Sequence, residues 1–163
     1  RFHERCRPAA GHISAFITNL TGIQWQDVQA ADRQDAVAGR FLAWLRERGC
    51  TTLVGHNAIG FDVRFLKAAL CRTVAASART AEEQPLHIFD THLFARHVDG
   101  VGPYVKGYKQ IDLYRAAFAE PQPDQHTAMG DITGLARIIA HRGWADTISG
   151  EPGQGAWTVN WNF

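Results

Sequence analysis

The interpretation of this chain depends on one stretch of sequence, Gly55-His56-Asn57-Ala58-Ile59-Gly60-Phe61-Asp62-Val63-Arg64-Phe65-Leu66. Before it stands Thr51-Thr52-Leu53-Val54, a short apolar and β-branched run that predicts a buried strand. From Phe61 onward the apolar residues return at helical spacing, which predicts a helix over residues 61–72. Asp62 is therefore expected at the carboxyl end of a strand, in the first turn of a helix. A lone acid in that place is more often a helix cap than a reactive group.

A second polar cluster, His126-Thr127-Ala128-Met129-Gly130-Asp131, stands at the start of the last long helix, predicted over residues 127–141. With His126 just ahead of the helix and Asp131 in its first turn, both side chains can approach one site. Histidine acts as a general base near neutral pH, and carboxylates are hard oxygen ligands for magnesium or manganese. A polar cluster that only caps the helix explains this motif equally well.

The segments around these motifs alternate between strand and helix. Residues 25–48 carry apolar side chains at helical spacing, residues 86–89 form a second apolar run that stops at Asp90, and residues 111–118 return to the helical period. The order of strand, helix, strand and helix predicts an α/β fold whose parallel or mixed sheet is covered by helices.

The C-terminal segment has a different pattern. Beyond Gly150, four apolar residues alternate with polar ones: Trp157, Val159, Trp161 and Phe163. A period of two suits an edge strand, although a flexible tail with exposed aromatic residues explains it equally well. We expect one domain over residues 1–146 and a glycine- and tryptophan-containing tail over residues 147–163.

Length and composition suit one globular domain. The 163 residues are 45% hydrophobic, which is enough for one core and too little for two ordinary domains. The net charge of +1 neither demands nor excludes a nucleic-acid partner. The three cysteines form no C-x-x-C, which argues against a disulfide framework or a zinc site and favours a reducing, cytoplasmic location. No segment reaches the roughly 18 apolar residues of a membrane span.

Taken together, the two polar motifs resemble the second and third exonuclease motifs of the DEDDh (DnaQ-like) family, written here H-N-x-x-x-F-D-x-x-F-L and H-x-A-x-x-D. Three further segments resemble the family in the same order along the chain. They are the L-T-G-I of residues 20–23, the D-T of residues 90–91 and the L-Y-x-x-x-F of residues 113–118. The resemblance spans residues 2–142, and the shared order makes chance agreement improbable.

The resemblance implies a ribonuclease H-like mixed sheet flanked by helices. It also implies a 3′→5′ exonuclease, a phosphodiesterase that hydrolyses terminal bonds of DNA or RNA with two magnesium or manganese ions. Carried over residue by residue, Asp62 and Asp131 are metal ligands and His126 is the general base. Asn57 and Phe61 match positions near the terminal nucleotide of a single-stranded or 3′-terminal nucleic acid.

The sequence departs from the family at its first motif, D-x-E, because no such tripeptide occurs in the chain. Asp90 matches a family position outside the metal-binding acids, so we expect it to be structural. With Asp62 and Asp131 alone, the site would hold two divalent ions poorly, and the chain by itself is expected to be weak or inactive. The strands near Val54 and Ile88 are also expected to lack neighbours.

These departures suggest a domain truncated at its N-terminus, since the chain begins at Arg1 and its only methionine is Met129. We expect upstream residues to supply the missing motif and strands, with a partner or the C-terminal segment as alternatives. A different interpretation is a non-catalytic nucleic-acid-binding or scaffold module derived from an exonuclease. The presence of Asp62, His126 and Asp131 argues against a long-standing loss of activity.

Overall fold

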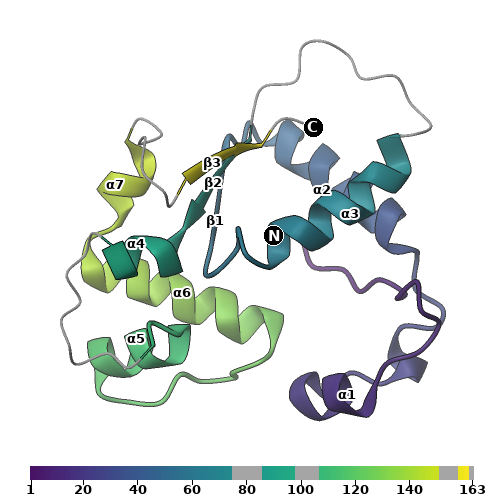
Figure 1. The fold of residues 1–163 in the computed structure, drawn as a ribbon, viewed down its shortest axis with the longest axis horizontal. Helices are drawn as coiled ribbons and strands as arrows, with labels where there is room; N and C mark the ends of the chain where they lie inside the picture. Colours follow the sequence, from purple (N-terminus) through teal and green to yellow (C-terminus); the bar gives the residue numbers. More distant parts are fainter. Residues whose placement is uncertain (75–85, 98–106, 151–157, 162–163) are drawn as a thin grey trace. The chain divides into compact units, whose positions relative to one another are not determined.

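The computed structural model describes residues 1–74, 86–97, 107–150 and 158–161, with residues 71–74 and 158–161 described by their backbone alone (Figure 1). The chain forms two compact units. The helical unit contains Arg1–Thr51 and Val63–Gln84 together with Phe163, and the sheet unit contains Thr52–Asp62 and Pro85–Asn162. Every residue to which the sequence assigns a chemical role belongs to the sheet unit.

Within the described residues, the sheet unit contains a three-stranded sheet in the order β1-β2-β3. β1 (Thr52–Gly55) is parallel to β2 (Leu86–Asp90), and β2 is antiparallel to β3 (Thr158–Trp161). In the parallel pair Gly55 lies opposite Asp90, so the carboxyl ends of both strands meet. Both predicted strands and the mixed character of the sheet are confirmed, but only β2 is largely buried, and the burial predicted for β1 is wrong.

β3 lies inside the C-terminal segment whose alternation predicted an edge strand. It pairs with the edge of β2 that β1 leaves open, with Ile88 opposite Val159. Of the alternatives offered for the open strand edges, the C-terminal segment is therefore the one found at β2, whose N–H and C=O groups gain partners from β3. Within the described residues β1 pairs with β2 alone, and its Val54 side chain is exposed.

Helices build the core of the sheet unit around β2. α4 (Thr91–His97) follows β2 directly, α5 (Gln110–Phe118) packs against α6 (Ala128–Arg142), and α7 (Ala145–Ser149) follows α6. The apolar side chains of these elements form one buried cluster: Phe89, Phe94, Ala95, Leu113, Tyr114, Ile138 and Trp144. Removing these side chains from water is the main force that holds the helices on the strand.

The helical unit differs from the prediction at its first long helix. The spacing of apolar residues predicts one helix over residues 25–48, but the structure has a short 3-10 helix, η1 (Trp25–Asp27), followed by α2 (Gln34–Glu47). The break occurs because Arg33 is extended, with φ −66° and ψ 153°, and forms a β-bridge with Arg7. A pairing with a distant segment therefore overrides the local helical pattern.

Two further helices involve the helical unit. α1 (Ala15–Thr21) begins after Ser14, whose hydroxyl accepts the N–H of Ile17 at 3.3 Å and so caps the helix. α3 (Asp62–Val74) begins at the last residue of one sheet-unit segment and continues in the helical unit. Its first residue, Asp62, therefore belongs with the turn that follows β1.

Candidate functional site

The turn that follows β1 is held by the buried carboxylate of Asp90, at the end of β2. Asp90 is 1% exposed. Its oxygens accept the backbone N–H groups of Asn57 at 2.9 Å, Ile59 at 3.0 Å and His92 at 3.0 Å. The bonds from Asn57 and Ile59 join the carboxyl ends of two parallel strands, which is where α/β folds commonly place ligands. Asp90 thus has structural contacts of the kind expected for it.

Two glycines let this turn close tightly. A Cβ at Gly60 would lie 2.6 Å from the side-chain oxygen of Asn57. A Cβ at Gly55 would lie 2.6 Å from the Cβ of Ala58. Asn57 is in the left-handed region at φ +60°, which asparagine tolerates better than most residues. The turn ends at Phe61, whose N–H donates to the Asn57 carbonyl at 3.0 Å and whose side chain is 57% exposed. The two residues predicted near a terminal nucleotide are therefore joined by a backbone hydrogen bond.

Asp62 is the first residue of α3, and its side chain retains access to solvent. The surrounding protein atoms remove part of its hydration and so raise the pKa of Asp62 above its ordinary value. A hydrogen bond from its own backbone N–H opposes this rise in pKa, and the negative charge of Asp90 adds to it. A carboxylate in this environment is stabilised by a nearby cation.

Asp131, in the first turn of α6, is held by two glutamines. Gln122 is 4% exposed, and its Nε2 donates to Asp131 Oδ1 at 3.1 Å. Gln110, at the start of α5, donates to the side-chain oxygen of Gln122 at 3.1 Å and to the Asp131 carbonyl at 2.7 Å. The sequence interpretation missed both glutamines, because a single buried amide produces no periodic pattern. The one local signal is the position of Gln122 between Pro121 and Pro123.

His126 lies in the loop directly before α6, in left-handed backbone at φ +66°, with an exposed side chain. Its backbone N–H donates to Asp131 Oδ1 at 3.4 Å, so these two predicted site residues are brought together. The helix cap is made by Thr127, whose hydroxyl accepts the N–H of Gly130 at 3.0 Å and donates to the Asp124 carbonyl at 2.8 Å. Capping therefore does not use the imidazole of His126.

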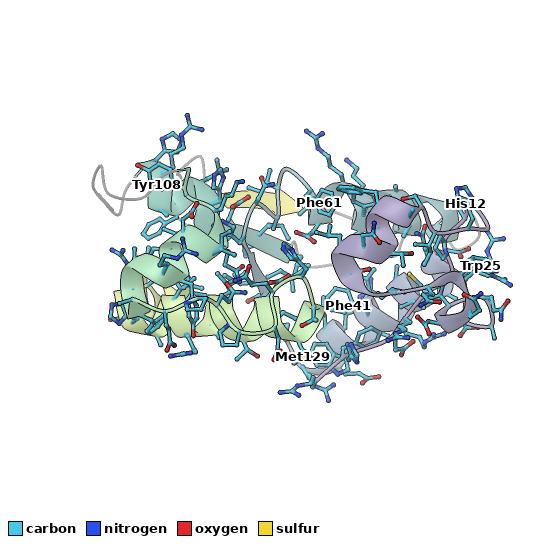
Figure 2. All side chains as sticks on the ribbon, turned by 90° about the horizontal axis from the view of Figure 1, so that it is seen from below. His12, Trp25, Phe41, Phe61, Tyr108 and Met129 are labelled. Carbon is cyan, nitrogen blue, oxygen red and sulfur yellow. The ribbon has the colours of Figure 1, made fainter. Side chains whose placement is uncertain are left out.

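The predicted site residues of the two motifs lie on separate elements of the sheet unit, whereas residues 63–66 at the end of the first motif belong to the helical unit; Figure 2 labels Phe61 from the first motif and Met129 from the second. Within the described parts of the chain, no three His, Cys, Asp or Glu side chains are grouped so that they could hold a metal ion. Whether Asp62 and Asp131 hold a metal ion with further ligands stays a prediction.

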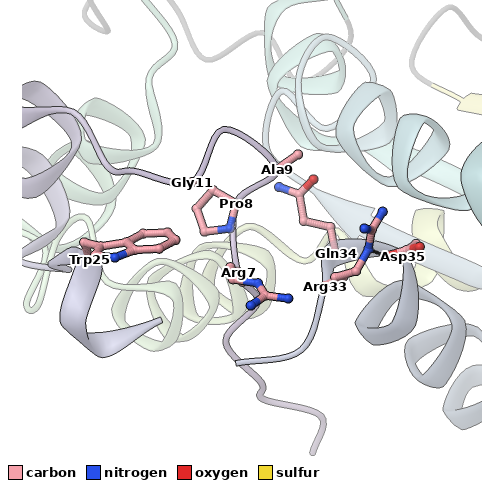
Figure 3. A pocket seen from close by; sticks show the side chains of 8 residues that line it. All are labelled: Arg7, Pro8, Ala9, Gly11, Trp25, Arg33, Gln34 and Asp35. Carbon is pink, nitrogen blue, oxygen red and sulfur yellow. Dashed lines mark hydrogen bonds and ion pairs between the residues drawn. The ribbon is translucent and has the colours of Figure 1, made fainter. Parts of the chain in front are cut away.

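A pocket of about 420 Å³ lies in the helical unit, and none of the predicted site residues lines it. Its wall includes Arg7, Trp25, Arg33 and Asp35 (Figure 3). The Arg33 side chain donates to Asp35 at 3.2 Å, and this bond lowers the pKa of Asp35. Arg7 donates to the carbonyl of Gln29 at 3.4 Å. Because both cations already have oxygen partners, we assign no ligand to this pocket.

Two further observations concern the cysteines and the helices. Cys6 and Cys50 are free, and burial raises the pKa of the Cys6 thiol. The side chain of Cys71 lies outside the described residues. Among the helices that the structure describes, none has the length and apolar character needed to cross a membrane.

Comparison with known families supports the interpretation drawn from the motifs. The family model RNase_T, described as an exonuclease, matches residues 1–139. The matched span includes the turn after β1, all of β2 and the start of α6, and so contains both polar motifs. A comparison with curated proteins gave no match.

Proposed function

Because the chain belongs to the DEDDh-type (DnaQ-like) exonuclease family, we propose that it hydrolyses terminal phosphodiester bonds of DNA or RNA in the 3′→5′ direction. The observation that supports this most is that the predicted site residues of both motifs belong to one unit. Asp62 begins α3 directly after the turn fixed by Asp90, and Asp131, in the first turn of α6, accepts the backbone N–H of His126. Metal-assisted hydrolysis of a phosphodiester uses a general base together with carboxylate ligands for the metal, and these residues can supply both.

In this proposal His126 is the general base. Its exposed imidazole, just ahead of α6, can accept a proton from the water that attacks the terminal phosphate. The backbone N–H of His126 donates to the Asp131 carboxylate, so the two residues are adjacent. The loop is thus joined to Asp131 through its backbone, and the helix cap does not use the imidazole.

The proposed binding residues for the terminal nucleotide are Asn57 and Phe61. The Phe61 side chain is 57% exposed, and a base stacked on an aromatic ring gains about 1–3 kcal/mol. The exposed amide of Asn57 offers both a donor and an acceptor. Stacking accepts every base, so the expected partner is a single-stranded or 3′-terminal nucleic acid of any sequence.

The proposed cofactor is magnesium or manganese, with Asp62 and Asp131 among its ligands. Carboxylate oxygens suit these hard cations, and a cation would offset the partial dehydration that raises the pKa of Asp62. The described residues do not complete a metal site, because no three potential ligands are grouped. A two-ion site needs further carboxylates, and the 163 residues alone are expected to bind the ions weakly.

The lack of grouped ligands within the described residues favours a second candidate, a non-catalytic nucleic-acid-binding or scaffold module. Such a module would bind a 3′ end through Asn57 and Phe61 without cleaving it. It provides no use for the His126 imidazole, which takes no part in the helix cap.

One assay separates the two candidates. A single-stranded oligonucleotide labelled at its 3′ end is incubated with the protein at its full natural length, either with manganese or with a chelator. Manganese-dependent release of the labelled mononucleotide, abolished by Asp62→Ala or by Asp131→Ala, supports the exonuclease. Asp146→Ala removes an exposed acid from α7 and should keep full activity as the matched control. Binding without cleavage would reject the exonuclease in favour of the module.

The proposed domain comprises residues 1–146, with residues 147–163 as an appended tail. In support of this division, the family match ends at residue 139. The tail nevertheless contributes β3 to the sheet. The full-length protein shortened after residue 146 should therefore keep the nuclease activity of the parent and unfold at a lower temperature, because the edge of β2 would be open. Loss of activity in a truncated chain that remains folded would contradict the division.

A further inference from the structure

Gln122 is a buried polar side chain for which neither motif accounts. It stands between Pro121 and Pro123, which restrict the backbone on both sides. The residue is 4% exposed and packs on α6 at Gly134, where a Cβ would lie 2.6 Å from its side-chain carbon. Glycine at position 134 is therefore what allows the Gln122 side chain to lie against the helix backbone.

The orientation of the Gln122 amide follows from its partners. Gln110 Nε2 donates to the side-chain oxygen of Gln122 at 3.1 Å, so the Gln122 nitrogen faces the other way. There it donates to Asp131 Oδ1 at 3.1 Å. A flipped amide would place its oxygen against the Asp131 carboxylate and its N–H groups against the Gln110 amide. Only one orientation therefore satisfies the network.

The hydrogen bond from Gln122 uses one carboxylate oxygen of Asp131, Oδ1, and does not involve the other, Oδ2. Oδ1 accepts the Gln122 amide N–H and, at 3.4 Å, the backbone N–H of His126. Within the described residues no hydrogen bond reaches Oδ2. An aspartate in the first turn of a helix has several staggered rotamers, and a donor that holds Oδ1 selects one of them.

We propose that Gln122 is a positioning residue, whose buried amide holds Asp131 in the rotamer that keeps Oδ2 available to a divalent cation. Gln110 supports it by fixing the direction of the amide. The part that concerns the cation rests on the proposed function, in which Asp131 is a metal ligand. The hold on the rotamer does not depend on that function, so the two parts can be tested separately.

The test uses Gln122→Met, which keeps the length of the side chain and removes the amide. Three-bond couplings of Asp131 in NMR spectra should report one rotamer in the parent protein and an average over several in the variant. Manganese affinity, measured from the free-ion signal in electron paramagnetic resonance, should fall by about tenfold or more. Gln26→Met, at an exposed position in η1, is the control and should change neither measurement.

A double-mutant cycle shows whether Gln122 acts through Asp131. If it does, Gln122→Met combined with Asp131→Asn binds manganese no more weakly than Asp131→Asn alone. Additive losses, or a single Asp131 rotamer in Gln122→Met, overturn the inference. If the parent protein binds no manganese, the ligand role of Asp131 fails, while the couplings still decide the positioning role. Should Gln122→Met not fold, Gln110→Met removes the bonds to the Gln122 oxygen and to the Asp131 backbone carbonyl but leaves the amide of Gln122 in place, and it should produce the same changes at smaller size.

Discussion

The carboxylate of Asp90 accepts the backbone N–H of Asn57 at 2.9 Å, although the two residues are 33 positions apart in the chain. The bond ties the end of β2 to the turn that follows β1. Because Phe61 and Asp62 come directly after this turn, Asp90 controls where they lie without taking part in the proposed chemistry.

Asp90→Ala should lower the free energy of unfolding by about 3 kcal/mol, because the N–H groups of Asn57, Ile59 and His92 lose their acceptor. Urea unfolding followed by circular dichroism measures this change. Asp146→Ala, which removes an exposed acid, should stay within about 0.5 kcal/mol of the parent. Equal stability of the two variants would show that the turn does not depend on Asp90.

His56 should make the stability of the sheet unit depend on pH. Burial, reinforced by the charge of His92, lowers the pKa of His56 from 6.5 to about 4. Its ring nitrogens lie 3.0 Å from Thr91 Oγ1 and 2.9 Å from the carbonyl oxygen of Tyr108. The unfolded chain takes up a proton at higher pH than the folded chain does, so acid favours unfolding. The contribution is complete above pH 6.5 and is lost as the pH falls toward about 4.

The loss of stability from His56 should reach about 3 kcal/mol across that range. Urea unfolding at several pH values should give a flatter pH dependence for His56→Gln than for the parent. His97→Gln, at an exposed position in α4, should keep the slope of the parent. An unchanged slope in His56→Gln would mean that other groups cause the acid sensitivity.

Gly130→Ala should lower the free energy of unfolding by about 1–3 kcal/mol. A Cβ at this position would lie 2.0 Å from the carbonyl oxygen of Asp124, so the loop that carries His126 must move. Gly39→Ala is the matched control, because a Cβ in that place in α2 meets nothing within 4 Å. That control should stabilise the protein by about 0.5–1 kcal/mol. If thermal unfolding shows that Gly130→Ala stabilises the protein as Gly39→Ala does, the Asp124 carbonyl does not limit the space at position 130.

Thr127→Ala should cost about 1 kcal/mol, since the first turn of α6 loses the hydroxyl that accepts the Gly130 N–H. Thr127→Ser keeps the hydroxyl and should recover most of that stability. Chemical unfolding of the two variants measures the difference. Equal losses in both would assign the effect to packing of the threonine methyl group.

His126→Ala should lower kcat by about 10²–10⁴-fold and leave KM nearly unchanged, because the imidazole acts on the attacking water. Steady-state release of mononucleotides by the full-length protein measures both constants. His97→Ala, which removes an exposed imidazole from α4, should keep the kcat of the parent. A rise in KM with constant kcat would instead assign His126 to substrate binding.

Local patterns predicted the elements that build the site. The apolar runs at residues 51–55 and 86–89 correspond to β1 and β2, and the helical spacing after Ile111 and Thr127 corresponds to α5 and α6. Such patterns work because the buried face of a strand or helix must repeat with the period of its backbone. The predicted helix over residues 25–48 was wrong at Arg33, whose pairing with Arg7 depends on a segment outside any local window.

Residue identity and order were enough to recognise the two motifs, with Asp62 after a strand and His126 and Asp131 at the start of a helix. Other features were decided by contacts between distant segments. These are the hydrogen bonds from the turn after β1 to Asp90, the pairing of β3 with β2, and the hydrogen bond from the Gln122 amide to Asp131. The chemical groups of a side chain follow from its residue type alone, so the sequence determines them. Its burial and its hydrogen-bond partners depend on which distant parts of the chain fold against it, so only the tertiary structure determines those.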